Sequence, residues 1–366
     1  MTSYWLDEPF PERAANRLDG HVDVEVVGGG VTGCTVALMA ARGGLRVRLH
    51  EAREISSGAS GRSGGFALRG GAMPYSTARE ELGTERAQKL WHLTERTLDH
   101  MAELAGDALR RVGSVRVAID AAERADLEDD FQALRADGFE VEWLEDRFSG
   151  AILHPRDGAL RPARWVRRLA ALAAEAGADL REHSRVGSIE ELDADHVVVA
   201  TDGYTRGLDP ALDAAITPVR GQVIATEPLG ERVFECPHYA RYGFDYWQQT
   251  DDGRLILGGR RDTQLDHEFT SEETVTDAIQ RELEAFAEEL IGERPKITHR
   301  WAGLFGQTSD LIPLAGRVPG HDRLWVAAGY SGHGNVLGLA CGELVAQAIL
   351  GQPAPELDLF DPARLL

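Results

Sequence analysis

The feature that most constrains the fold is a glycine-rich turn between an apolar run and a helical pattern. HVDVEVV at 21–27 is a short β-rich run that stops at three glycines, and VTGCTVALMAARGG at 31–44 has helical periodicity, small residues and a Gly-Gly stop. LRVRLHE at 45–51 reads as a second strand. Strand, turn, helix and strand form a βαβ unit, which predicts a parallel sheet covered by helices.

The turn matches G-x-G-x-x-G at 28–33, and Glu51 ends the second strand 18 residues after Gly33. In this context the spacing indicates a dinucleotide site. Gly28 makes the turn, Gly30 lets the backbone approach a pyrophosphate at the helix N-terminus, and Gly33 lets helix and strand pack closely. Glu51 is expected to accept hydrogen bonds from a ribose.

SSGASGRSGG at 56–65 follows shortly after Glu51 and has too little apolar surface to form core. A flexible linker is one interpretation, but a linker has no reason to sit inside the first nucleotide-binding unit. Backbone N–H groups of a Gly/Ser loop form anion-binding nests, and Arg62 would add a cation to the phosphates or face a ring. NAD is possible from 28–33 alone, whereas a second cradle at 56–65 favours FAD.

The rest of the chain continues as α/β, then a β-rich stretch, then α/β again. A hairpin turn is expected at 251–253, and TSEE at 270–273 reads as a capping box before a helix with apolar residues through Leu290. The other expected elements are helices at 79–110, around 127–134, at 162–177 and at 334–350, and strands at 113–119, 195–201 and 324–329. The expected domains are a discontinuous FAD-binding domain (1–78, 150–215 and 312–366) and a substrate domain (79–149 and 216–311).

Composition narrows the functional classes. A chain of 366 residues is long enough for two domains, and a net charge of −21 argues against a nucleic-acid partner. No apolar run approaches the roughly 20 residues that span a bilayer, and the start lacks a secretory pattern. Cys34, Cys236 and Cys341 lie far apart, without metal-ligand spacing. We therefore expect a cytoplasmic protein with no metal site and no disulfide framework.

Several further motifs occur in a familiar order. After GGGVTG, HEAR and GASGRSGG come HPRDGALRPARWVRRL, VVVATDGYT, ITPVRGQ, LILGGR, WAGLFGQTSDLIPLAG and GYSGHGNVLGLACGELVA. The chain resembles FAD-dependent oxidoreductases of the D-amino-acid oxidase, glycine oxidase and sarcosine oxidase superfamily over nearly its whole length. The GASGRSGG form is most similar to the γ-glutamylputrescine oxidase-like amine branch. The resemblance implies an α/β fold, with a Rossmann-like FAD-binding domain and an inserted mixed β-sheet substrate domain of α+β type.

The resemblance also implies the cofactor contacts. The loop at 59–65 would wrap the pyrophosphate and isoalloxazine, and 329–334 would bring a helix N-terminus to the pyrimidine edge of the flavin, where its dipole stabilises negative charge. The residues implied to bind FAD are Gly28, Gly30, Val31, Thr32, Gly33, Glu51, Ala52, Arg53, Ala59, Ser60, Gly61, Arg62, Ser63, Gly64, Gly65, Val186, Thr201, Asp202, Gly203, Gly303, Gly329, Tyr330, Ser331, Gly332, His333 and Gly334.

Departures from the family pattern bear on the substrate. Relatives that act on α-amino acids carry an arginine after the Gly-Leu of W-x-G-L, where this chain has Phe305. We therefore expect a primary or secondary amine without an α-carboxylate, unless Arg69 supplies a cation from another side. Tyr246 would line an aromatic pocket that holds an ammonium, with sheet packing as the alternative, and His333 would polarise the flavin edge, contact substrate or cap the turn.

Two other departures concern the flavin. No cysteine lies between Cys236 and Cys341, so FAD is expected to be non-covalent, and Ile256 stands where relatives carry an oxygen-activating lysine. The expected reaction is hydride transfer from the amine α-carbon to flavin N5, giving an imine that hydrolyses to a carbonyl, with O2 or another acceptor reoxidising the flavin. Glycine or D-amino-acid oxidase and a non-catalytic FAD-binding subunit are the alternatives. A monomer, a homo-oligomer and a heteromeric complex all stay open.

Overall fold

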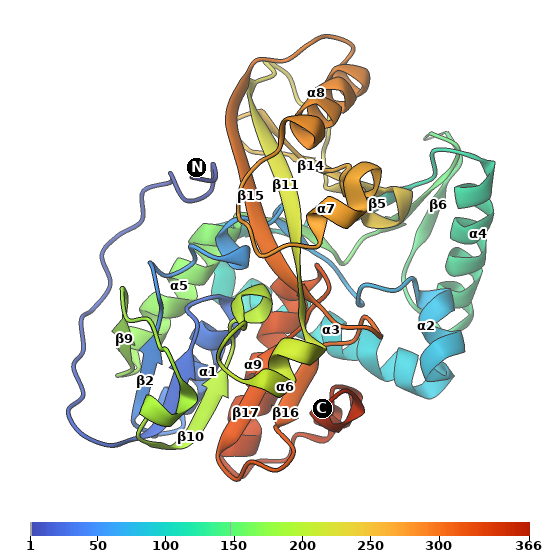
Figure 1. Cartoon of the computed structure of the whole chain (residues 1–366). Helices are drawn as coiled ribbons and strands as arrows, with labels where there is room; N and C mark the ends of the chain where they lie inside the picture. Colours follow the sequence, from blue (N-terminus) through green and yellow to red (C-terminus); the bar gives the residue numbers. More distant parts are fainter. Residues whose placement is uncertain (1, 147) are drawn as a thin grey trace.

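The computed structural model describes residues 2–146 and 148–366. The molecule has two lobes, a lower and an upper one in the view of Figure 1. Two long strands, β11 (Thr217–Pro228) and β15 (Ile297–Gln307), run from the lower lobe into the upper lobe. These strands pair antiparallel with each other from Thr217↔Gln307 to Thr226↔Ile297. They therefore connect the region of the predicted nucleotide unit to the β-rich part of the chain.

The lower lobe is built on a six-stranded sheet in the order β16-β17-β10-β1-β2-β9. The five strands from β17 to β9 are parallel, and β16 joins the edge antiparallel. The βαβ unit predicted from the glycine turn is confirmed at the centre of this sheet. The strands are β1 (Val22–Val27), β2 (Val47–His50), β9 (Asp179–Arg181), β10 (Ala194–Val199), β16 (Leu314–Arg317) and β17 (Leu324–Ala328).

Both faces of this sheet are covered, and apolar residues of its strands pack against both layers. Val24, Val26 and Val198 pack under the helices, whereas Val27 and Val199 belong to the apolar cluster on the other face. Helix α1 contacts both α5 and α9 on the first face, and Leu212 of α6 packs into the second. These helices are α1 (Val31–Arg42), α5 (Pro162–Glu175), α6 (Pro210–Ala215) and α9 (Gly334–Ile349).

The upper lobe contains an eight-stranded mixed sheet in the order β15-β11-β14-β13-β12-β5-β7-β6. Helix α8 (Asp277–Ile291) packs on one face through Ile279, Leu283 and Phe286, which join Trp247 and Leu257 in one apolar cluster. The expected hairpin at 251–253 is confirmed as the connection of β13 to β14. The remaining strands are β5 (Ser114–Val117), β6 (Glu142–Leu144), β7 (Ala151–His154), β12 (His238–Ala240), β13 (Asp245–Gln249) and β14 (Arg254–Gly259).

One expected helix is two helices. The pattern at 79–110 breaks at Gly83, whose φ of +82° is disfavoured for other residues, and the second helix ends at Ala105. The helices outside the two large sheets are α2 (Tyr75–Leu82), α3 (Thr84–Ala105), α4 (Ala121–Ala136) and α7 (Leu265–Glu268). A small antiparallel sheet consists of β3 (Phe66–Ala67), β8 (Gly158–Leu160) and β4 (Leu109–Arg110).

Short 3₁₀ turns complete the chain trace. They are η1 (Ala59–Gly61), η2 (Gly106–Ala108), η3 (Ile189–Glu191), η4 (Asp202–Tyr204), η5 (Arg241–Gly243), η6 (Arg261–Gln264), η7 (Pro355–Leu359) and η8 (Pro362–Arg364).

The capping box expected at TSEE is wrong. Helix α8 begins at Asp277 with Thr276 at the N-cap, six residues after Thr270. The N–H of Thr276 donates to Oε1 of Gln222 on β11 (2.9 Å), and Glu273 pairs with arginines elsewhere. Residues distant in the sequence therefore bind the Glu273 carboxylate and the N–H at the start of α8, and no local capping box forms.

The expected division into domains stays a prediction. Strands of the six-stranded sheet come from 22–50, 179–199 and 314–328, and strands of the eight-stranded sheet come from 114–154 and 217–307. Strand β7, at 151–154, pairs in the eight-stranded sheet although we expect 150–215 to belong with the FAD-binding domain.

Candidate cofactor and substrate site

A cavity of about 650 Å³ lies where the two lobes meet. Its walls come from the start of α1, the segments at 59–66 and 69–77, strands β11 to β14, and the segments at 303–307 and 330–336. The glycine turn, the Gly/Ser loop and the β-rich region thus share one space. The expected site residues that line it are Gly30, Val31, Thr32, Ala59, Ser60, Arg62, Ser63, Gly64, Arg69, Asp202, Tyr246, Gly303, Phe305, Tyr330, Ser331, Gly332, His333 and Gly334.

Two glycines of the turn allow backbones to approach closely. Gly28 has a φ of +112°, and a Cβ there would lie 2.5 Å from the carbonyl oxygen of Ala200. A Cβ on Gly33 would lie 1.9 Å from the carbonyl oxygen of Gly28, so any side chain at 33 would push α1 away from the turn. These two residues do not line the cavity; they hold the start of α1 against it.

Glu51 is held beside the turn by backbone donors. The N–H of Gly29 donates to Oε2 of Glu51, and the N–H of Arg53 donates to Oε1, both at 2.8 Å. Each carboxylate oxygen carries two lone pairs, so an acceptor position remains on each for a ribose hydroxyl. Ala52, Val186 and Thr201, also expected at the cofactor, do not line the cavity, and neither do Gly61, Gly65, Gly203 and Gly329.

The start of α1 fits an anionic ligand. Gly30 is its N-cap and supplies no side-chain cap, while Ser60 Oγ accepts from the N–H of Val31 (3.1 Å). The other first-turn N–H groups have no partner within the helix and carry the positive end of its dipole. Ser57 Oγ is buried without a hydrogen-bond partner. These donors and the Gly/Ser loop fit the pyrophosphate of FAD.

Arg62 holds the Gly/Ser loop onto β15. Its Nε lies 2.8 Å from Oε1 of Glu273 and donates to Ser57 O, and its Nη1 donates to Ala302 O at 3.2 Å. The indole N–H of fully buried Trp301 donates to the carbonyl of Arg62 at 2.8 Å. This guanidinium therefore acts as a structural clamp, and Trp301 belongs to the core.

Glu273 and Asp202 extend this clamp. Glu273 also pairs with Arg53 (3.2 Å) and accepts from the hydroxyl of Tyr204. Asp202 accepts from the N–H groups of Gly306 and Gly329, each at 2.9 Å. Burial raises the pKa of Asp202, and these donors oppose the rise. Sequence reasoning missed Glu273 because its partners lie more than 60 residues away in the chain.

The turn before α9 closes another side of the cavity. Ser331 and Gly332 have positive φ values of +51° and +90°, and His333 is the N-cap of α9, but its side chain makes no capping hydrogen bond. Nε2 of His333 lies 3.4 Å from the hydroxyl of Tyr239. Burial lowers the pKa of His333 to about 4, so the imidazole is neutral at neutral pH.

Aromatic side chains line the cavity next to the Gly/Ser loop. Tyr246 packs so closely that a Cβ on Gly258 would lie 2.4 Å from its ring and one on Gly64 would lie 2.8 Å away. Tyr239 lies directly across from Tyr246 on the neighbouring strand. Burial raises the pKa of Tyr246 to about 12, so its hydroxyl stays protonated. Trp247 points to the opposite face of the sheet and packs on Phe286.

Arg69 reaches the cavity wall already paired. Its side chain is 1% exposed, and Nη1 lies 2.8 Å from Oε1 of Glu95. Nη2 approaches Nδ1 of His154 at 3.2 Å, and the guanidinium lies over the ring of Phe139. Its charge is therefore compensated by the protein.

Arg261 is a cavity residue that sequence reasoning missed. Its guanidinium lies over the rings of Phe244 and Phe305, at 4.4 and 5.5 Å from their centroids. The sequence signal for it was the pair of arginines that follows LILGG, a motif from which we drew an expectation only for Ile256. Ile256 itself is buried beside Trp5 and Trp301.

The three cysteines are buried with free thiols, and none lines the cavity. Within the described residues, no helix is long and apolar enough to span a bilayer.

Comparisons with known proteins show relatives in sequence and in fold. The probable oxidoreductase OrdL of Rhizobium meliloti is 28% identical, with 99% of this chain and 91% of the relative covered. The gamma-glutamylputrescine oxidoreductase of Escherichia coli is 28% identical over 92% of this chain and 85% of the relative. Among solved structures, glycine oxidase from Geobacillus kaustophilus matches with a TM-score of 0.78 and 24% identity, covering 94% of this chain and 98% of that one, which shows the same fold.

The family model described as "FAD dependent oxidoreductase" (DAO) matches residues 23–348. The expected family, α/β fold and FAD cofactor are therefore confirmed. The chain belongs to the DAO family of FAD-dependent oxidoreductases, enzymes that act on amines or amino acids.

Proposed function

We propose that this enzyme oxidises the C–N bond of a small amine by removing a hydride from the carbon next to nitrogen, giving an imine that water hydrolyses to a carbonyl. One observation carries the proposal: the nucleotide cradle and the aromatic wall of Tyr239, Tyr246 and Phe305 line the same cavity. FAD, when bound, supplies the hydride acceptor. The protein's part is to position the amine and to exclude water.

The walls of the cavity are suited to positioning an amine and excluding water. Tyr246 and Phe305 line the cavity with aromatic rings, which exclude water from a bound amine. Neutral His333 and the N-terminus of α9 lie on another wall, where the helix dipole favours negative charge. The neighbouring protonated tyrosines add no charge that would oppose it.

We also propose that FAD is held without a covalent bond to cysteine, since all three thiols are buried away from the cavity. The free thiols also support the proposed cytoplasmic location. Oxygen is proposed to be a slow acceptor, because Ile256, the residue at the position of the relatives' lysine, is apolar and buried.

Anaerobic mixing of the FAD-loaded protein with a panel of primary and secondary amines and D- and L-amino acids tests the function. The expected result is loss of the flavin's blue absorption band with at least one compound of this panel. Readmitted air then separates an oxidase, which recovers the band quickly, from a dehydrogenase. A yellow protein that no compound reduces would contradict the proposal and favour a non-catalytic FAD-binding subunit.

A further inference from the structure

We propose that Arg261 binds an anionic group of the substrate, so that the enzyme acts on an amine that also carries a carboxylate. This inference rests on the proposed function and names the substrate class of the same cavity. It changes the expectation drawn from Phe305, because the cation absent from β15 is supplied by the segment that follows β14.

The backbone after β14 turns two adjacent arginines in different directions. Gly259 has a φ of +129°, and Arg260 follows in the left-handed region at +59°. The guanidinium of Arg260 lies over Phe286, and its Nε lies 3.2 Å from Oδ1 of buried Asp245. Arg261 instead faces the cavity. The strained turn therefore gives one arginine a structural partner and leaves the other beside the proposed substrate.

The guanidinium of Arg261 is positioned by aromatic rings but not neutralised. Its central carbon lies over the rings of Phe244 and Phe305, and a phenyl ring offers no oxygen or nitrogen atom to accept its N–H donors. Among residues 2–146 and 148–366, no carboxylate lies within 4.0 Å of it and no protein group accepts a hydrogen bond from it. A carboxylate would match this planar set of donors with two parallel hydrogen bonds.

The other lining arginines contrast with Arg261. Arg62 pairs with Glu273, Arg69 with Glu95, and Arg116 with Asp130 (3.3 Å). The lining aspartates are likewise engaged. Asp130 also accepts from Ser76, Asp157 from Ser114 and the N–H of Arg69, and Asp202 from backbone N–H groups. Among the described residues that line the cavity, these pairings leave Arg261 as the positive charge without a carboxylate partner, in a chain whose net charge is −21.

Burial adds an energetic reason for an anion at this place. Desolvation lowers the pKa of Arg261, and the groups that act against it are tyrosines and more distant carboxylates. A bound carboxylate would compensate this desolvated charge directly. Phe305 then contributes to substrate binding indirectly, because it is one of the two rings that hold the guanidinium of Arg261 in place.

The first experiment measures anion binding without turnover. Phenylacetate and phenylacetamide have nearly the same shape but differ in charge, and each is titrated into the FAD-loaded protein by calorimetry. Phenylacetate is expected to bind better. R261M is expected to lower the affinity for phenylacetate by about 100-fold and to change the affinity for phenylacetamide by no more than about twofold. R261K is expected to keep part of the affinity for phenylacetate, because it retains the charge but not the planar fork of donors.

Arg281 provides the matched control, because it is an exposed arginine on α8, away from the cavity. R281M removes the same charge from the chain and is expected to bind both compounds as the unmodified protein does. Flavin absorption and melting temperature verify that each variant is folded and loaded. Equal binding of phenylacetate by R261M and the unmodified protein would overturn the proposal, as would an unmodified protein that prefers the amide or does not discriminate.

The second experiment separates this inference from the proposed function. Anaerobic flavin reduction is compared for L- and D-phenylalanine and phenethylamine, which lacks the carboxylate. Faster reduction by an amino acid, lost in R261M but not in R281M, supports the role of Arg261. Reduction by phenethylamine alone, unchanged in R261M, overturns the inference and leaves the proposed function standing. If none of these three compounds reduces the flavin, the full panel of amines and amino acids decides the proposed function, and the binding titration still tests the role of Arg261.

Discussion

At the scale of single residues, the proposed cofactor cradle depends on positions where a side chain has no room. Gly33→Ala would put a Cβ 1.9 Å from the carbonyl oxygen of Gly28, which is backbone and cannot rotate away. We expect the free energy of unfolding to fall by about 2–3 kcal/mol and FAD affinity to fall at least about tenfold. Chemical denaturation and FAD titration measure the two effects.

Gly44→Ala is the control for that substitution. Gly44 also has a positive φ, +89°, but nothing lies within 4 Å of its Cβ position. It should lose only about 1 kcal/mol of stability through backbone strain, and its FAD affinity should not change. Similar FAD affinities for the two variants would show that close packing at Gly33 does not shape the cradle.

His333 gives stability a pH dependence of predictable sign. Its pKa is lowered to about 4 by burial, so between about pH 6.5 and pH 4 the unfolded chain binds a proton that the folded protein does not. Stability therefore falls as pH drops through this window. Replacement by Gln removes the titrating group, so the loss between pH 7.5 and pH 5 should be smaller in H333Q by about 1–2 kcal/mol. Equal losses in urea denaturation would contradict the burial of a neutral imidazole.

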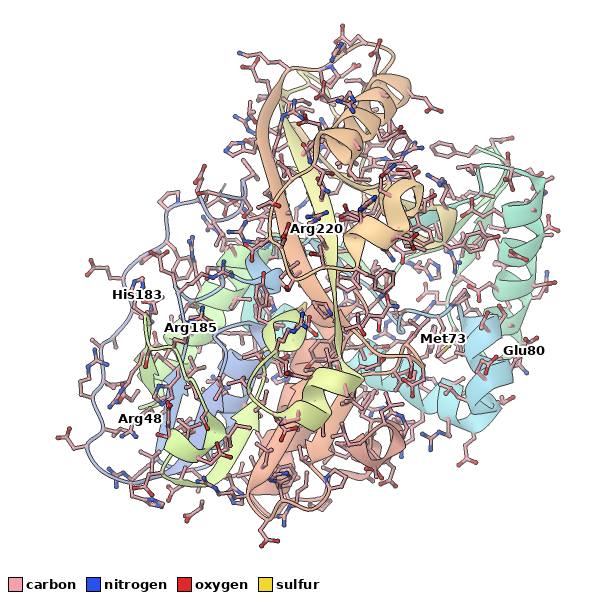
Figure 2. The ribbon with its side chains drawn as sticks, viewed as in Figure 1. Arg48, Met73, Glu80, His183, Arg185 and Arg220 are labelled. Atoms are coloured by element: carbon pink, nitrogen blue, oxygen red, sulfur yellow. The ribbon has the colours of Figure 1, made fainter. Side chains whose placement is uncertain are left out.

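At the scale of elements, α7 is held on the long strand β11 by a buried charge network. Arg220 of β11 lies beside α7 in Figure 2, and its Nη2 is 2.8 Å from Oε1 of Glu268. Gln222 also donates to that carboxylate, and all three side chains are buried. This anchor holds the segment that carries Leu265 and Phe269 to the cavity wall.

Breaking this pair should cost far more than breaking an exposed one. E268Q leaves Arg220 buried with a weaker partner, and we expect a loss of about 3 kcal/mol in the free energy of unfolding. Lys296 and Glu227 form an exposed ion pair, so K296M should cost less than about 1 kcal/mol. If both variants lose the same amount in chemical denaturation, the anchor is not a buried pair in solution.

Local sequence signals predicted most helices and strands, and they failed where hydrogen bonds or ion pairs to residues remote in the sequence determine the local structure. The βαβ unit followed from apolar runs and glycines, and the hairpin after β13 followed from Asp-Asp-Gly, because both signals are local. TSEE does not form a capping box, because Glu273 forms ion pairs with Arg53 and Arg62. The N–H of Thr276 donates a hydrogen bond to Gln222. Arg69 was likewise considered as a replacement for the arginine missing at Phe305, but the sequence could not reveal its partner Glu95, 26 residues onward.

At the scale of the molecule, the cavity joins segments that are remote in sequence. Thr32 lies on α1 of the lower lobe and bonds Tyr330 (2.8 Å), whereas Tyr246 belongs to the eight-stranded sheet and packs on Gly64. Sequence motifs suggested the proposed cofactor cradle because its segments carry local signals. The unpaired guanidinium of Arg261 depends on Phe244, Phe305 and the turn after β14, which only the structure brings together.

A ligand that contacts both lobes should stabilise them together. FAD at about 100 times its Kd should add about 2.7 kcal/mol to the free energy of unfolding and raise the melting temperature in one cooperative transition. Calorimetry of the apoprotein and the loaded protein checks this prediction. Two separate transitions, of which FAD shifts only one, would show that the cofactor binds within a single lobe.

The most direct test of the central claim is the product of a single anaerobic turnover. The FAD-loaded enzyme is mixed with each compound that reduces its flavin, and the carbonyl product is trapped as a hydrazone and counted against the reduced flavin. C–N bond oxidation predicts one carbonyl, and one ammonia or amine, for each flavin reduced. A reduced flavin without a matching carbonyl would contradict oxidation of a C–N bond in this cavity.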